Sequence, residues 1–146
     1  MKLTIWVAIV FGVLFAGCVR AEDSTREVGG WYAEYNTASV HYSTANKKEQ
    51  ELTMECLLGD WTFAYADKMG EETNSVDDKM TIVVDGAAYA VPKTQKQRDV
   101  LYAAIAHAKK GIQFRTHQFG DSDVFPVKGL AVLFQDLPFE VSPCIS

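Results

Sequence analysis

One histidine and two aspartates are the residues of this chain best placed for acid–base chemistry. His117 precedes Asp121 and Asp123 in a stretch whose turn residues would bring all three side chains to one hairpin. A histidine held beside a carboxylate can act as a general acid or base. This predicts one candidate activity, a hydrolase-type enzyme that uses His117 with Asp121 or Asp123. Exposed polar faces are the simpler explanation for the same residues.

Other catalytic and metal-binding motifs are missing from the sequence. It contains no G-x-S-x-G nucleophile elbow, no P-loop and no H-E-x-x-H motif. His41, His107 and His117 are too far apart in sequence for a zinc-like spacing. Asp121-Ser122-Asp123 is only a fragment of a calcium loop, and turn chemistry explains both carboxylates. We therefore expect no catalytic residues, no metal and no cofactor, and favour a protein that is not an enzyme.

The first residues have the pattern of a secretory signal peptide. Lys2 gives a positive start, residues 3–16 are uncharged and mostly apolar, and Arg20 ends the apolar run. The run is shorter than the roughly 20 residues that a membrane-spanning helix needs. We expect residues 1–21 to be a signal peptide and residues 22–146 to be a single β-rich globular domain in the periplasm or outside the cell.

Cys18 leaves two locations open. Cleavage after Ala21 would remove Cys18 and release a soluble protein. Cleavage before Cys18 would use the stretch Phe15-Ala16-Gly17-Cys18, which looks like the lipobox of bacterial lipoproteins with Phe15 where Leu is usual. In that case Cys18 would carry a lipid and anchor the protein to the membrane.

Cys56 and Cys144 remain as a pair in either case. Secreted proteins fold in oxidising compartments, where disulfides form and persist. We expect a Cys56–Cys144 disulfide that ties the C-terminal tail to a central strand. Two buried free thiols are the alternative.

The charge balance excludes some classes of partner. The chain has 14 basic and 19 acidic residues, and loss of Lys2 and Arg20 with the signal peptide would leave a net charge of −7. A domain this acidic should repel nucleic acid, whose binding depends on neutralising phosphates. An anionic membrane surface is disfavoured for the same reason. We expect no nucleic acid, and contact with a membrane only through a lipid on Cys18.

Alternating apolar and polar residues predict most of the strands. Asp85-Gly86 is typical of a two-residue hairpin turn, and Gly59-Asp60 is interpreted as a second one. Residues 22–30 are polar and are expected to be a flexible lead-in, and residues 67–79 a solvated acidic loop. Strands are expected at residues 31–36, 38–44, 52–58, 61–66, 80–84, 87–91, 111–117 and 124–127.

Two helices complete the expected fold. A capping box of Thr94 and Gln97, followed by apolar residues at helical spacing, predicts a helix over 94–110 with basic residues in its last turn. Apolar residues also predict a short helix over 129–137. The expected class is α+β, a mostly antiparallel β-sheet with one main helix and a short C-terminal helix.

The stretch LYAAIAHAKKGIQFRTHQFGDSDVFPVKGLAVLFQDL, residues 101–137, reads as helix, Lys-rich end, strand, polar turn, strand, glycine and apolar helix. With Trp31 near the mature start and the Asp85-Gly86 hairpin, this order resembles the secreted proteins of the invasion-associated locus B type. The resemblance implies a secreted or envelope-located β-rich domain without an established catalytic set. That family usually has more cysteines in its middle than this chain has, so the resemblance implies a location more than an activity.

Aromatic and acidic residues supply the expected binding surface. Residues 31–65 are rich in Tyr and Trp, which are enriched at protein-binding hot spots, although some of these rings must fill the core. We predict a secreted envelope protein that recognises a protein partner, basic in charge, as an inhibitor-like, immunity-like or host-interaction factor. A small-ligand carrier is an alternative. The residues expected to bind the partner are Tyr32, Tyr42, Trp61, Glu71, Glu72, Asp77 and Asp78.

Overall fold

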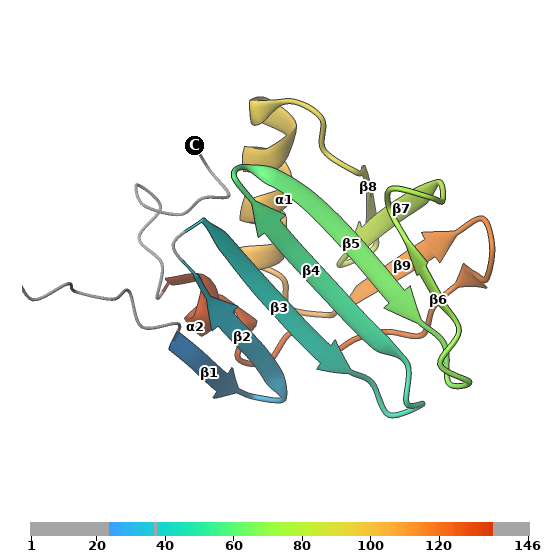
Figure 1. The fold of residues 1–146 in the computed structure, drawn as a ribbon. Coiled ribbons are helices and arrows are strands. Elements are labelled where there is room, and N and C mark those ends of the chain that lie inside the picture. The colour runs from blue at the N-terminus through green and yellow to red at the C-terminus, as the bar shows by residue number, and fades with distance from the viewer. Residues whose placement is uncertain (1–23, 37, 136–146) are drawn as a thin grey trace, which may run out of the picture.

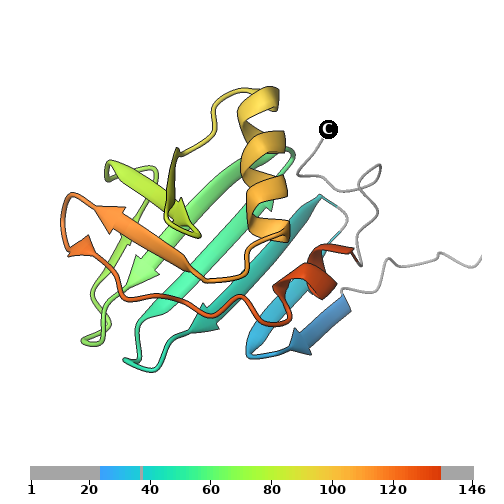
Figure 2. The same ribbon diagram turned by 180° about the vertical axis from the view of Figure 1, so that it is seen from behind.

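The computed structural model of the protein describes residues 24–36 and 38–135. Two antiparallel sheets, of six and four strands, account for most of the regular secondary structure among the described residues. Figure 1 shows the six-stranded sheet in front, and Figure 2 shows the helices and the smaller sheet covering its back face. The predicted α+β class, mostly antiparallel β with one main helix and a short C-terminal helix, is confirmed.

The larger sheet is a meander in which each strand pairs with the next along the chain. Side chains along these strands alternate between a buried and an outer face, as the period of a β-strand requires. The strands are β1 (Ser24–Val28), β2 (Trp31–Tyr35), β3 (Ser39–Ala45), β4 (Glu51–Leu57), β5 (Asp60–Ala66) and β6 (Glu72–Asn74).

Two segments that were expected to lack regular structure form the edge strands of this sheet. The expected flexible lead-in contains β1, which pairs with β2 over its whole length. The expected loop of residues 67–79 contains β6, which pairs with β5. Both predictions were wrong because these polar strands lie at the sheet edges, where one backbone partner is enough and few apolar residues are needed.

The turn between β4 and β5 lies one residue earlier than predicted. Its central residues are Leu58, with φ of 51°, and Gly59, with φ of 92°. Leu57 pairs with Asp60, so Asp60 belongs to β5. A type I′ turn needs positive φ at both central positions, and Leu58 adopts it with its side chain 74% exposed.

The smaller sheet has the order β10-β9-β7-β8. Its strands are β7 (Met80–Val84), β8 (Ala87–Ala90), β9 (Ile112–Thr116) and β10 (Gly120–Asp121). Asp85 and Gly86 have φ of 51° and 91°, which confirms the predicted hairpin turn.

The predicted strand at residues 124–127 is reduced to a single bridge between Phe125 and Ile112. Pro126 has no N–H to donate to a ladder, and its carbonyl accepts a hydrogen bond of 2.7 Å from Trp31 Nε1. The segment at residues 124–127 therefore hydrogen-bonds to both sheets: Phe125 pairs with β9 of the smaller sheet, and the Pro126 carbonyl accepts from a side chain on β2 of the larger sheet.

Helix α1 (Gln95–Ala106) has the predicted capping box at its N-terminus, formed by Thr94 and Gln97. The helix is shorter than expected, and Lys109 and Lys110 follow it instead of lying in its last turn. Helix α2 (Leu130–Gln135) lies within the predicted range, and residues 136 and 137 fall outside the described residues.

Candidate functional site

The structure separates the predicted aromatic residues into buried and exposed ones. Tyr42 is 1% exposed and stacks on Phe134 with ring centroids 4.8 Å apart, and Trp61 is 5% exposed. Burial raises the pKa of Tyr42, so its hydroxyl stays protonated. Including Tyr42 and Trp61 in the binding surface was therefore wrong, because both lie on the buried face of the sheet. Tyr32, on the outer face, is 40% exposed.

The acidic loop divides in a similar way. Glu71, Glu72 and Asp77 are exposed, and the Asp77 carboxylate accepts a hydrogen bond of 2.8 Å from Asn74. The Asp78 carboxylate instead accepts the Gln118 backbone N–H at 3.1 Å. Asp78 therefore joins the loop to the β9–β10 turn, while the other three carboxylates face solvent.

Both aspartates considered for acid–base chemistry form ion pairs with residues other than His117. Asp121 pairs with Arg115 at 2.9 Å, and Asp123 pairs with Lys48 at 3.0 Å. His117 is exposed in the β9–β10 turn. Across the described residues, no group of three or more His, Cys, Asp and Glu side chains is placed to hold a metal ion.

Cys56 is fully buried in β4, where its register partner on β5 is Trp61. Cys144, its expected disulfide partner, and Cys18, the expected lipid site, lie outside the described residues. The disulfide and the lipid anchor stay predictions.

The strand register collects glutamates on the outer face of the larger sheet. Glu34, His41 and Glu55 are direct cross-strand neighbours on β2, β3 and β4. In Figure 1 this face is turned to the viewer, and no helix lies in front of it. We call it the acidic face, defined by the outward glutamates of β1, β2, β4 and β6, which are Glu27, Glu34, Glu51, Glu55 and Glu72.

No lysine or arginine occupies an outward position on these six strands in the part of the chain that the structure describes. Small side chains separate the glutamates in the middle of this face. His41 is the one histidine among the outward positions of the described strands. The small residues at outward positions of β3, β4 and β5 are Ser43, Thr53, Thr62 and Ala64.

A hollow of about 460 Å³ lies at one side of the acidic face. Three carboxylates line it, from Glu55 on β4, Glu72 on β6 and Asp77 in the loop that follows. Thr53, Thr62 and Asn74 add polar groups to the same wall. The acidic loop predicted from sequence and the sheet face that was not predicted thus form one continuous surface.

Sequence reasoning did not group Glu34, His41 and Glu55 into one surface. The signal for them was present, because each occupies the polar position of an alternating strand. What alternation alone does not show is the register, and the register makes these three residues neighbours.

No family model, curated protein or solved structure matches this chain. Among the described residues, no helix is long and apolar enough to span a membrane.

Proposed function

We propose that this protein is a non-enzymatic, secreted envelope protein that binds a basic protein partner on its acidic face. Its role would be that of an inhibitor-like, immunity-like or host-interaction factor. The observation that carries the proposal is the charge of one sheet face: five outward glutamates with no lysine or arginine among the outward positions of the described strands.

Like charges gathered on one face create a field that steers an oppositely charged protein during encounter. Glu34 and Glu55 lie on strands two apart, which places them roughly 10 Å from each other. That separation is close to the Debye length of about 10 Å at 0.1 M salt, so their fields add at the surface. A partner surface with lysines or arginines at similar spacing would match them.

Two further features suit a protein partner more than a small cation. Tyr32 is half-exposed beside the glutamates and offers an aromatic contact of the type found at interface hot spots. The hollow beside Glu55 is large enough for a side chain of the partner, and its carboxylates would pair with a lysine or arginine.

The proposal is tested first by capturing the partner. The natively processed protein is used to isolate a basic partner from envelope extract after mild crosslinking, and the intact mass of the same sample reports cleavage after Ala21 or a lipid on Cys18. Association rates with that partner are then compared for the wild type and the double variant Glu34→Gln, Glu55→Gln. We expect the double variant to associate about tenfold more slowly at low salt, with a flatter salt dependence.

The matched control is the double variant Asp99→Asn, Asp121→Asn, which removes the same charge from α1 and β10. We expect its association rate to change by less than about twofold. Equal slowing in both double variants would show that only net charge matters, and an unchanged rate in the first would remove the acidic face from the proposal.

A further inference from the structure

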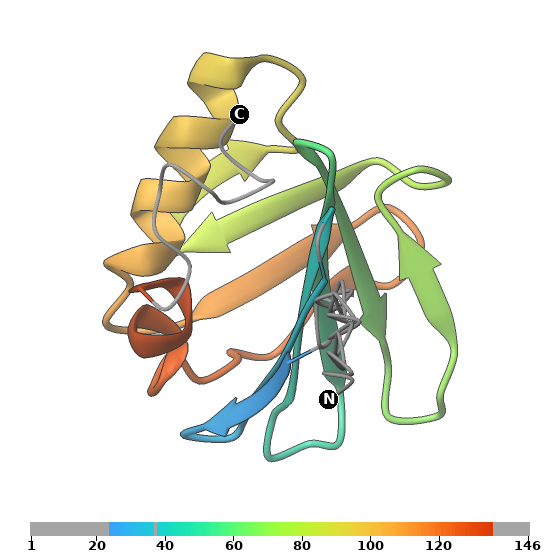
Figure 3. The same cartoon turned by 60° about the vertical axis from the view of Figure 1, so that its left-hand side comes forward.

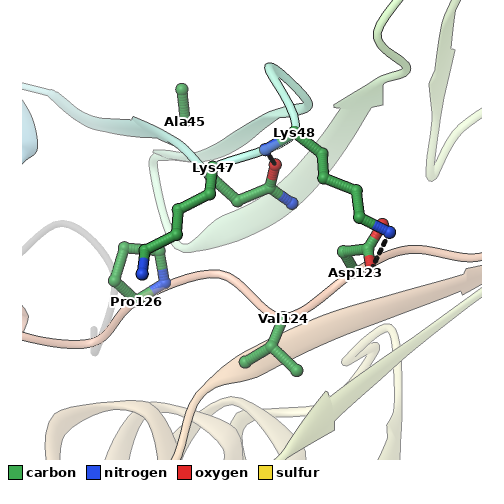
Figure 4. A pocket seen from close by; sticks show the side chains of 7 residues that line it. Ala45, Lys47, Lys48, Asp123, Val124 and Pro126 are labelled. Carbon is green, nitrogen blue, oxygen red and sulfur yellow. Dashed lines mark hydrogen bonds and ion pairs between the residues drawn. The ribbon is translucent and has the colours of Figure 1, made fainter.

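A second hollow lies away from the middle of the acidic face. Its volume is about 590 Å³, within the range of small-molecule sites. One wall is the end of β3 with the β3–β4 turn, at residues 45–48, and the other is the segment 123–126 that follows β10. Figure 4 shows the two walls facing each other across the hollow.

The turn wall is held in one conformation by its own hydrogen bonds. The Asn46 side-chain oxygen accepts the backbone N–H groups of Lys48 and Gln50, at 2.9 and 3.2 Å. The Asn46 amide nitrogen donates to Gln50 Oε1 at 2.7 Å. A turn braced in this way loses little conformational freedom when a ligand binds.

Two contacts join the walls at one end of the hollow. Lys48 Nζ pairs with the Asp123 carboxylate at 3.0 Å, and the Asp123 backbone N–H donates to Gln50 Oε1 at 3.0 Å. These contacts use the charge of Lys48 and set the separation of the walls. The hollow is therefore formed before any ligand arrives.

The hollow has apolar lining residues, and Lys47 is the one charged lining residue among those described that has no ion pair. Val124 is 51% exposed and shares its wall with Pro126, while Ala45 belongs to the opposite wall. Figure 4 shows the Lys47 side chain extending toward Pro126. No carboxylate within residues 24–36 and 38–135 pairs with the Lys47 ammonium group.

We propose that this hollow binds a soluble, single-chain amphipathic carboxylate, with the aliphatic chain on Val124, Pro126 and Ala45 and the carboxylate at the Lys47 ammonium group. An exposed apolar lining favours a hydrocarbon chain because burial removes apolar surface from water. The Lys47 cation favours an anionic head over a neutral one. The site adjoins the acidic face, because Ala45 is the cross-strand neighbour of Glu51, but it shares no residue with that face and its test needs no protein partner.

Trp31 provides a direct reporter for this site. Its indole N–H donates to the Pro126 carbonyl at 2.7 Å, so a ligand seated on Pro126 will shift the indole resonance. The protein, labelled with ¹⁵N at its tryptophan indoles, is titrated with dodecanoate below the concentration at which dodecanoate forms micelles. We expect a saturable shift of the Trp31 signal, with binding weakened roughly fourfold for each buried methylene removed from the chain.

The variant Lys47→Gln tests the charged end of the site. We expect it to weaken dodecanoate binding roughly fivefold, while dodecanol binds wild type and variant equally. The matched control is Lys68→Gln, which removes an exposed lysine from the loop between β5 and β6 and should leave the affinity unchanged.

Three outcomes would overturn the proposal. The first is the absence of a saturable Trp31 shift with dodecanoate. The second is equal weakening of dodecanoate binding in Lys47→Gln and Lys68→Gln. The third is a Trp31 shift that appears only with vesicles containing anionic phospholipid, which would assign the surface to a membrane instead of a soluble amphiphile.

Discussion

The Asp85 carboxylate joins the turn between β7 and β8 to the backbone that leads into β9. The carboxylate accepts the backbone N–H groups of Lys109, Lys110 and Gly111, at 2.9, 2.7 and 3.1 Å. These hydrogen bonds, that of Lys109 most strongly, lower the pKa of the Asp85 carboxyl below its ordinary value of 3.8. Two lysines expected to neutralise the end of α1 therefore contribute their backbone N–H groups to a hairpin turn instead.

This lowered pKa makes the stability of the fold depend on acid. Because the folded-state pKa lies below the unfolded-state pKa, ionised Asp85 stabilises the fold above about pH 4, and that stabilisation is lost as the pH falls through the folded-state pKa. Asp85→Asn keeps a residue that tolerates positive φ but removes the charge. We expect this variant to have a lower Tm near pH 7 and a smaller drop in Tm between about pH 4 and pH 2.

Thermal unfolding, monitored by circular dichroism, measures the Tm near pH 7 and its drop in acid. The exposed Glu71, replaced by Gln, serves as the control and should change neither. If Tm falls by the same amount in Asp85→Asn and in the wild type between about pH 4 and pH 2, the hydrogen bonds to Asp85 do not cause the loss of stability in acid.

At the scale of elements, α2 is held to the rest of the molecule by two tyrosine hydroxyls. Tyr35 on β2 donates to the Leu133 carbonyl at 2.9 Å, and Tyr102 on α1 donates to the Phe134 carbonyl at 3.0 Å. The last carbonyls of a helix have no partners within the helix, so these hydroxyls satisfy them. Burial raises the pKa of both tyrosines, which keeps the hydroxyls available as donors.

Removing either hydroxyl should loosen α2. We expect Tyr35→Phe and Tyr102→Phe each to lower the free energy of unfolding by about 1 kcal/mol and to speed amide hydrogen exchange in α2 more than elsewhere. Tyr32→Phe, on the outer face, should lower it by less than about 0.5 kcal/mol. Unchanged exchange in α2 would show that apolar packing of Leu133 and Phe134 holds the helix without the tyrosines.

At the scale of the whole molecule, two glycines allow distant parts of the backbone to touch. A Cβ on Gly129, where φ is 92°, would lie 2.2 Å from the Val28 carbonyl oxygen. A Cβ on Gly29 would lie 2.3 Å from the Lys128 carbonyl oxygen. The turn between β1 and β2 thus lies closely against the segment that begins α2, and Figure 3 shows the blue hairpin and the red helix on the same side of the molecule.

Gly129→Ala should therefore disturb this contact as well as the local backbone. We expect it to lower the free energy of unfolding by about 3 kcal/mol or more, because both steric overlap and positive φ oppose the methyl group. Gly30→Ala has the same type of positive φ but no atom within 4 Å of the added Cβ, so it should cost about 1–2 kcal/mol. Denaturant unfolding compares the two, and equal losses would mean that backbone strain alone is responsible.

Local patterns in the sequence were enough to predict the strands from β2 to β5, the Asp85-Gly86 hairpin and the capping box of Thr94 and Gln97. Each of these depends on residues within a few positions of one another, so the period of the side chains and the preferences of turn residues determine them. The same alternation also places Trp61 on a buried face, although its exposure had been expected.

Contacts between distant segments required the tertiary structure. The row of Glu34, His41 and Glu55 depends on register across three strands, and the pair of Lys48 with Asp123 depends on where residues 123–126 cross the molecule. Neither the acidic face nor the hollow beside Val124 follows from spacing along the chain. Their residues come together because the packing of two sheets, which is a property of the whole chain, sets which side chains meet.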